Sequence, residues 1–80
     1  TWASKGNTLL GLQRYEEAIE CYNNALKLNE NNPIVLNNKG VAYMELDDFN
    51  NAIKCFRKVL VMYPDNPDAQ VLQEVCLENL

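Results

Sequence analysis

The apolar positions of this chain recur with the period of a helix. One run consists of Ala18, Ile19, Tyr22, Ala25 and Leu26, at i, i+1, i+4, i+7 and i+8, which forms one stripe along a helix. A second run, Ala52, Ile53, Phe56, Val59 and Leu60, has the same spacing. The alternation typical of strands appears nowhere in the sequence, so the pattern predicts an all-α protein.

Capping and helix-breaking residues divide this pattern into five helices. Asn32-Pro33 and Asn66-Pro67 each combine an N-cap side chain with proline at the first helical position. Asp47-Asp48 can cap a helix that begins near Phe49, and Pro64 ends it. We therefore expect helices at about residues 2–12, 15–28, 33–46, 49–62 and 67–79, joined by short connections that make neighbours antiparallel.

The sequence also repeats itself after 34 residues. Lys5-Gly6 aligns with Lys39-Gly40, Ala18-Ile19 with Ala52-Ile53, Cys21 with Cys55, and Asn32-Pro33 with Asn66-Pro67. A repeat of this length indicates stacked helix hairpins that bury one another. We expect one domain with repeat one at residues 1–32, repeat two at 33–66 and a capping or next-repeat helix at 67–80. The fold class that we expect is a short right-handed superhelical solenoid of antiparallel helix hairpins.

Composition and charge narrow the classes of function. The 80 residues suffice for one small domain, and the absence of an initial Met leads us to expect an excerpt of a longer protein. The formal net charge of −4 argues against nucleic acid or an anionic membrane as partner, because both require clustered Lys and Arg.

The side-chain inventory argues against catalysis and metal binding. Histidine is absent and Ser4 is the only serine, so neither a Ser–His nor a Cys–His arrangement can form. The three scattered cysteines do not match the spacing of metal sites. Equivalent positions on stacked repeats place Cys21 and Cys55 about 8–10 Å apart, too far for a disulfide. We therefore expect no enzyme activity, cofactor, metal or disulfide, and a reducing, cytoplasmic location.

The repeat resembles the tetratricopeptide repeat (TPR) family, whose unit reads W-x2-L-G-x2-Y, A-x3-F and P. The matching residues are Trp2, Gly6, Ala18 and Tyr22 in repeat one, and Gly40, Tyr43, Ala52, Phe56 and Pro64 in repeat two. The departures are Lys5, Leu9 and Glu30 in repeat one, and Leu36 and Lys39 in repeat two. Gly6 and Gly40 are expected to let the two helices of each hairpin approach closely.

The resemblance implies a concave groove lined by the first helix of each hairpin, which binds a peptide or a partner helix. The candidate groove residues are Asn7, Leu10, Ile34, Asn37, Asn38, Val41, Met44, Val71 and Val75. Asparagine both donates and accepts hydrogen bonds, so it can pair with a peptide main chain, although merely solvated asparagines would look the same in sequence. We expect Asn37 and Asn38 to point away from the core.

Chaperone-binding relatives grip a terminal carboxylate with two asparagines and several basic residues. Asn7 and Asn38 match the asparagines, whereas Ala3, Asp68 and Leu72 stand where basic residues are required. The resemblance therefore disfavours binding of a chaperone tail. A small basic patch on the expected convex side, Lys54, Arg57 and Lys58, is more consistent with a solvated face.

The last helix carries two apolar strips. Ala69, Leu72, Cys76 and Leu80 are expected to pack on repeat two, and Val71 and Val75 to face the groove or another chain. Two hypotheses remain open. The chain is an interaction module that binds a protein or peptide in its groove, or a structural spacer that self-associates weakly through its N-terminal end or its last helix.

Overall fold

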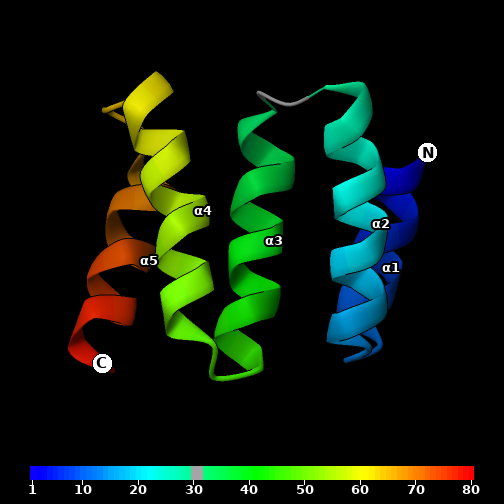
Figure 1. The fold of residues 1–80 in the computed structure, drawn as a ribbon, viewed down its shortest axis with the longest axis horizontal. Coiled ribbons are helices and arrows are strands. Elements are labelled where there is room, and N and C mark those ends of the chain that lie inside the picture. The colour runs from blue at the N-terminus through cyan, green and yellow to red at the C-terminus, as the bar shows by residue number, and fades with distance from the viewer. Residues whose placement is uncertain (30–31) are drawn as a thin grey trace.

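The computed structural model describes residues 1–29 and 32–80, so Glu30, which replaces the proline of the repeat motif, lies outside the described residues. Within them the chain forms five α-helices (Figure 1): α1 (Trp2–Gly11), α2 (Tyr15–Leu28), α3 (Pro33–Glu45), α4 (Phe49–Met62) and α5 (Pro67–Glu78). The predicted all-α fold is confirmed. Helices α1, α3 and α5 end one residue earlier than expected, because Leu12, Leu46 and Asn79 are their C-caps.

The predicted caps form hydrogen bonds at three helix starts. Asn32 accepts from the backbone N–H groups of Ile34 and Val35, and Asn66 accepts from that of Ala69 at 3.0 Å. Asp48 accepts from the N–H of Asn51 at 3.4 Å. These bonds satisfy backbone donors that the first helical turn leaves without partners.

The turns inside the two hairpins share one conformation. Gln13 and Asp47, which are 34 residues apart, both lie in the left-handed region, with φ of 63° and 59°. Nothing in the sequence indicated this at Gln13, since Asn, Asp and Gly are the usual residues there. The repeat therefore extends to the backbone of its turns.

The helices stack so that the molecule has two different broad faces. Helices α1 and α2 form one hairpin and α3 and α4 the second, while α5 packs on α4 (Figure 1). On one side the backbone of α3 lies close to those of both α1 and α5, whereas on the other side the backbones of α2 and α4 are farther apart. The helices α1, α3 and α5 are therefore closer together than α2 and α4. The stack curves toward the side of α1, α3 and α5, which is its concave side.

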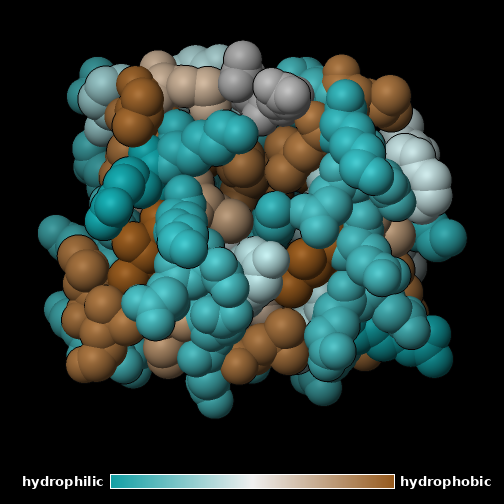
Figure 2. Space-filling model, in the orientation of Figure 1, coloured by the Kyte–Doolittle hydropathy of each residue, from teal (hydrophilic) through white to brown (hydrophobic). Residues whose placement is uncertain are grey.

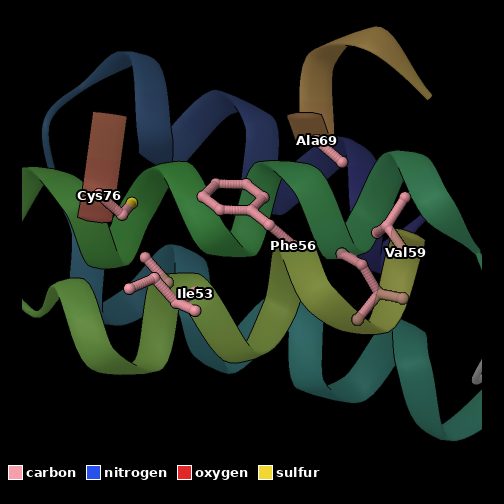
Figure 3. Packing of buried hydrophobic residues seen from close by; sticks show 7 residues of the cluster. Ile53, Phe56, Val59, Ala69 and Cys76 are labelled. Carbon is pink, nitrogen blue, oxygen red and sulfur yellow. The ribbon is translucent and has the colours of Figure 1, made fainter. Parts of the chain in front are cut away.

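The core lies between α3, α4 and α5 and continues into repeat one. Its larger cluster consists of Leu36, Ala52, Ile53, Phe56, Val59, Ala69 and Cys76 (Figure 3). A smaller cluster of Ala18, Tyr22 and Val35 joins α2 to α3. Burial of these apolar side chains is the main term that stabilises the stack.

The two glycines at equivalent repeat positions allow the hairpins to close. A Cβ atom on Gly6 would lie 2.6 Å from Tyr22 Cε1, and one on Gly40 would lie 2.5 Å from Phe56 Cε1. Real Cβ atoms essentially never approach another heavy atom so closely. The expected close approach at both glycines is thus confirmed, and in each repeat a buried aromatic ring occupies the space.

The structure corrects two expectations about side-chain burial. Leu80 packs little on repeat two, because it lies after the end of α5 and is 67% exposed. Asn37 does not point away from the core, because its side chain is turned toward the start of α5. Cys21, Cys55 and Cys76 are buried free thiols. No helix in residues 1–29 or 32–80 has the length and apolar character needed to cross a membrane.

Candidate functional site

The concave side brings together part of the candidate set. Asn7 is exposed on α1, and Asn38 lies partly buried on α3 opposite to it. Leu10 packs partly against the smaller cluster, and Val41 and Met44 pack partly against the larger one. Ile34 is 68% exposed at the first turn of α3. The candidate residues on this side are thus apolar where they pack on the core, and polar at the Asn7–Asn38 pair.

A hydrogen-bond network centres on Asn7. The Tyr22 hydroxyl donates to Asn7 Oδ1 at 2.6 Å, and Asn38 Nδ2 donates to the same oxygen at 2.9 Å. The network links α1, α2 and α3, and it joins the two asparagines that the family resemblance singled out. Asn7 Oδ1 already accepts two hydrogen bonds, so its two lone pairs are occupied.

Asn37 has a structural position instead. Its Nδ2 donates to Asn66 Oδ1 at 3.4 Å, and Asn66 Oδ1 also caps α5 through the Ala69 N–H. The Asn37 side chain is buried, and its Oδ1 has no hydrogen-bond partner among the described residues. Asn37 therefore joins α3 to the start of α5.

Helix α5 contributes an exposed apolar strip. Val71 is 59% exposed and Val75 is 37% exposed, while Ala69 and Cys76 of the same helix are fully buried. The predicted packing is confirmed for Ala69 and Cys76, which belong to the larger core cluster. That Val71 and Val75 face a groove or another chain stays a prediction. Asp68, in the first turn of α5, is exposed and adds a negative charge to this end.

The opposite face is polar over much of its area, with apolar patches between the polar regions (Figure 2). Figure 2 shows largely polar side chains over α2 and α4, which lie in front of α1 and α5 in this view. Lys54, Arg57 and Lys58 of α4 are all exposed, as expected for a solvated face. In the described residues no three His, Cys, Asp or Glu side chains gather where they could hold a metal ion.

The tyrosine hydroxyls differ in their surroundings. Desolvation raises the pKa of the Tyr22 phenol above its ordinary value, and the neighbouring Cys21 adds to this. Tyr22 therefore remains a protonated donor throughout the neutral range. Tyr15 donates to Glu45 Oε2 at 3.3 Å in an exposed position between the two hairpins.

Sequence reasoning missed two polar partners. From the sequence, Tyr22 was expected only to fill space with its ring, and Asn66 only to cap a helix. The hydrogen bonds from the Tyr22 hydroxyl to Asn7 and from Asn37 to Asn66 were not predicted. A signal for the first was present, because repeat two has Phe56 and Val41 where repeat one has Tyr22 and Asn7.

The fold and this site define a helical repeat protein of the TPR class. A family model described as "TPR repeat" matches residues 6–47, and one described as "Tetratricopeptide repeat" matches residues 33–66. The chain belongs to the TPR family, with two repeats and a C-terminal helix.

One protein of similar sequence and two solved structures of similar fold are particular relatives of this chain. The chain is 39% identical over 71 residues to the human peptidyl-prolyl cis-trans isomerase FKBP4, covering 89% of this chain but 16% of that protein. The first TPR of Spaghetti (RPAP3) bound to the HSP90 peptide SRMEEVD has a TM-score of 0.94 at 23% identity, over 98% of this chain and 62% of that one. The Sgt2 TPR domain from Aspergillus fumigatus has a TM-score of 0.93 at 26% identity, over 98% of this chain and 52% of the other. The chain thus spans only part of each relative.

Proposed function

We propose that this chain is a protein-interaction module that binds a peptide or a partner helix along the concave face formed by α1, α3 and α5. The observation that carries the proposal is the Asn7–Asn38 pair, which leaves amide hydrogens free for a ligand beside apolar side chains that pack on the core. The exposed Val71 and Val75 extend this surface along α5. The role is binding rather than catalysis, in a reducing compartment such as the cytoplasm.

The proposed partner is an uncharged or basic segment with apolar side chains. The protein has a net charge of −4, and Asp68 lies at the α5 end of the groove. A strongly acidic ligand would be repelled there, because Ala3, Asp68 and Leu72 supply no cation to pair with it. Nucleic acid and anionic membranes are unsuitable partners for the same electrostatic reason.

The groove can be tested with a matched pair of valine substitutions. Val71 on α5 and Val61 on α4 are 59% and 77% exposed, so Val71→Glu and Val61→Glu make the same chemical change at two solvated helix positions. The probe is a linear peptide selected from a randomised display library on the wild-type protein. We expect Val71→Glu to weaken its binding at least tenfold and Val61→Glu to change it less than twofold. Equal effects of the two variants would contradict the groove.

The peptide SRMEEVD, which occupies the RPAP3 TPR, provides a test of charge preference. We expect this chain to bind it weakly, with a Kd on the order of 1 mM, and Asp68→Lys to strengthen the binding. Micromolar affinity of the wild-type protein would show that an acidic tail is accepted without a basic clamp. The partner assignment would then be wrong.

A second function, as a spacer that associates with another copy, is favoured by exposed apolar side chains at both ends. Trp2 is 43% exposed, and Leu77 and Leu80 are 51% and 67% exposed. If the display library yields no binder and sedimentation shows concentration-dependent dimers that Leu77→Glu disrupts, this interpretation replaces the peptide groove.

A further inference from the structure

The Tyr22 hydroxyl is a buried polar group with a single side-chain partner among residues 1–29 and 32–80. The residue is fully buried, and its hydroxyl donates to Asn7 Oδ1 across the first hairpin. A buried hydroxyl without a partner destabilises a folded protein, so Asn7 satisfies a requirement of the core. Asn7 itself is exposed, and this bond therefore connects the core directly to the concave surface.

The two distances agree with the way in which the Asn7 amide is turned. The 2.6 Å separation from the Tyr22 hydroxyl lies in the range of O–H···O bonds and is shorter than N–H···O bonds usually are. The 2.9 Å separation from Asn38 Nδ2 is typical of N–H···O. Asn7 Oδ1 therefore faces Tyr22 and Asn38, and Asn7 Nδ2 faces away from both.

Repeat two provides an internal comparison. Thirty-four residues after Asn7 and Tyr22 stand Val41 and Phe56, so the amide and the hydroxyl are absent together. The rings nevertheless take the same place, at 2.6 Å and 2.5 Å from the position of a Cβ on Gly6 and Gly40. Packing of the hairpin thus needs the ring and not the hydroxyl. The hydroxyl of Tyr22 therefore has a different role, which is the hydrogen bond to Asn7.

We propose that the Tyr22 hydroxyl is a positioning group that locks Asn7 with its Nδ2 hydrogens toward the groove, so that repeat one selects ligands through a carbonyl oxygen. The selection of a ligand rests on the proposed function; the orientation of the amide does not. Asn38 Nδ2 has one further hydrogen beyond the one given to Asn7, so the pair offers donors at one spot.

The consequence is that Asn7 acts only as a hydrogen-bond donor toward a ligand, unlike a freely rotating asparagine. A mobile amide can turn to accept from a ligand N–H or to donate to a ligand C=O. With Oδ1 held by two donors, Asn7 can only donate. A main-chain carbonyl of the ligand is the group that fits, and a ligand N–H at this point would lack an acceptor from Asn7.

The orientation can be tested without any ligand by NMR of the side-chain amides. In the wild-type protein we expect weak cross-peaks between the Asn7 amide hydrogens and the Tyr22 ring, because Nδ2 faces away from the hydroxyl. Tyr22→Phe should shift the Asn7 side-chain carbonyl carbon, because its oxygen loses one hydrogen-bond donor, and should strengthen these cross-peaks as the amide becomes free to turn. Tyr15→Phe is the matched control, because it removes a different tyrosine hydroxyl and should leave the Asn7 signals unchanged. Strong cross-peaks from the Asn7 amide hydrogens to the Tyr22 ring would reverse the assignment and overturn the proposal.

The binding arm uses the library-selected peptide. In Tyr22→Phe the Asn7 amide is no longer held toward the ligand. Binding should therefore weaken about fivefold, which corresponds to the net free energy of one neutral hydrogen bond. Tyr15→Phe should have no effect. The double variant Tyr22→Phe with Asn7→Ala should bind no more weakly than Asn7→Ala alone, since Tyr22 acts only through Asn7. A peptide in which the contacted peptide bond lacks its carbonyl oxygen should bind the wild type more weakly, and this loss should be smaller in Asn7→Ala, where only the Asn38 donor remains.

The outcomes separate this inference from the proposed function. If Asn7→Ala weakens binding and Tyr22→Phe does not, the groove is retained and the positioning role is wrong. If neither variant affects the binding of a peptide whose binding is weakened by Val71→Glu, the groove binds without Asn7 and Tyr22. The selection role is then wrong. If no peptide is selected at all, the proposed function fails, and the NMR measurement alone decides the orientation of Asn7.

Discussion

Gly40 and Gly11 are helical glycines in opposite surroundings. A Cβ on Gly40 would lie 2.5 Å from the fully buried Phe56 ring, whereas a Cβ on Gly11 would meet nothing within 4 Å. We expect Gly40→Ala to lower the free energy of unfolding by about 1–3 kcal/mol, the usual cost of overpacking. Gly11→Ala should raise it by up to about 1 kcal/mol, because alanine favours the helix.

Urea denaturation of both variants measures this difference. Gly40→Leu should be more damaging than Gly40→Ala, because more atoms must be accommodated against the ring. Gly40→Ala as stable as the wild type would mean that α3 and α4 do not pack closely at this glycine.

Buried thiols and phenols make the fold sensitive to alkali. Desolvation raises the pKa of Cys76, and it raises that of Cys55 against the opposing effect of Lys39 and Lys58. It also raises the pKa of the Tyr22 phenol. The unfolded chain therefore releases these protons first and binds fewer of them, so stability falls as pH increases. The loss begins near the ordinary cysteine pKa of about 8.5 and continues past the tyrosine value of about 10.

Denaturation curves at increasing pH test this dependence. The full stability should be present below about pH 8 and should decline above it. In a variant with Cys55→Ala and Cys76→Ala the decline should start later, at the tyrosine range. A free energy of unfolding that rises between about pH 8 and pH 10 would mean that the thiols and the phenol are not desolvated in the folded protein.

At the scale of the helices, two similar caps differ in their partners. Asn32 caps α3 through the N–H groups of Ile34 and Val35. Asn66 caps α5 through Ala69 and also accepts from Asn37 Nδ2. We expect Asn32→Ala to cost about 1 kcal/mol of unfolding free energy, as cap removals do.

Asn66→Ala should cost more, about 2 kcal/mol, because it also leaves the buried Asn37 amide without its partner. Adding Asn37→Ala to Asn66→Ala should then recover part of the loss, which a double-mutant cycle in urea would measure. Equal costs for the two caps, with additivity of Asn37 and Asn66, would exclude the α3–α5 connection.

Across the molecule as a whole, the core is unequally divided. The cluster between α3, α4 and α5 contains seven buried side chains, and the cluster between α2 and α3 contains three. In stacked repeats, stability is close to a sum over units and their interfaces. We expect α1 to open more easily than α3 and α4, so its amide hydrogens should exchange faster under native conditions.

Native-state hydrogen exchange followed by NMR gives this order directly. The Tyr22→Phe variant should speed exchange in α1 and α2 and leave α4 unchanged, because the hydroxyl joins only the first hairpin. Uniform exchange across all five helices would show a single cooperative unit instead.

The helices and their stacking could be predicted from the order of residues alone. Helical spacing, Asn-Pro caps and the 34-residue repeat located the five helices to within one residue, because each of these signals acts locally or repeats at a fixed interval. Gly6 and Gly40 also identified two close approaches between helices in advance, since a glycine inside a helix needs a packing reason. The pairing of Asn7 and Asn38 as candidates came from the family resemblance.

The role of each candidate side chain, by contrast, depends on which helices lie beside it in space. Asn37 and Asn38 are adjacent in sequence, yet one is buried against the start of α5 and the other bonds to Asn7 on the groove. Successive residues on a helix point about 100° apart, so their partners depend on how the helices stack. The same reason hid the Tyr22 hydroxyl: its partner lies fifteen residues away on a different helix, and no local pattern specifies that a buried ring reaches an exposed amide.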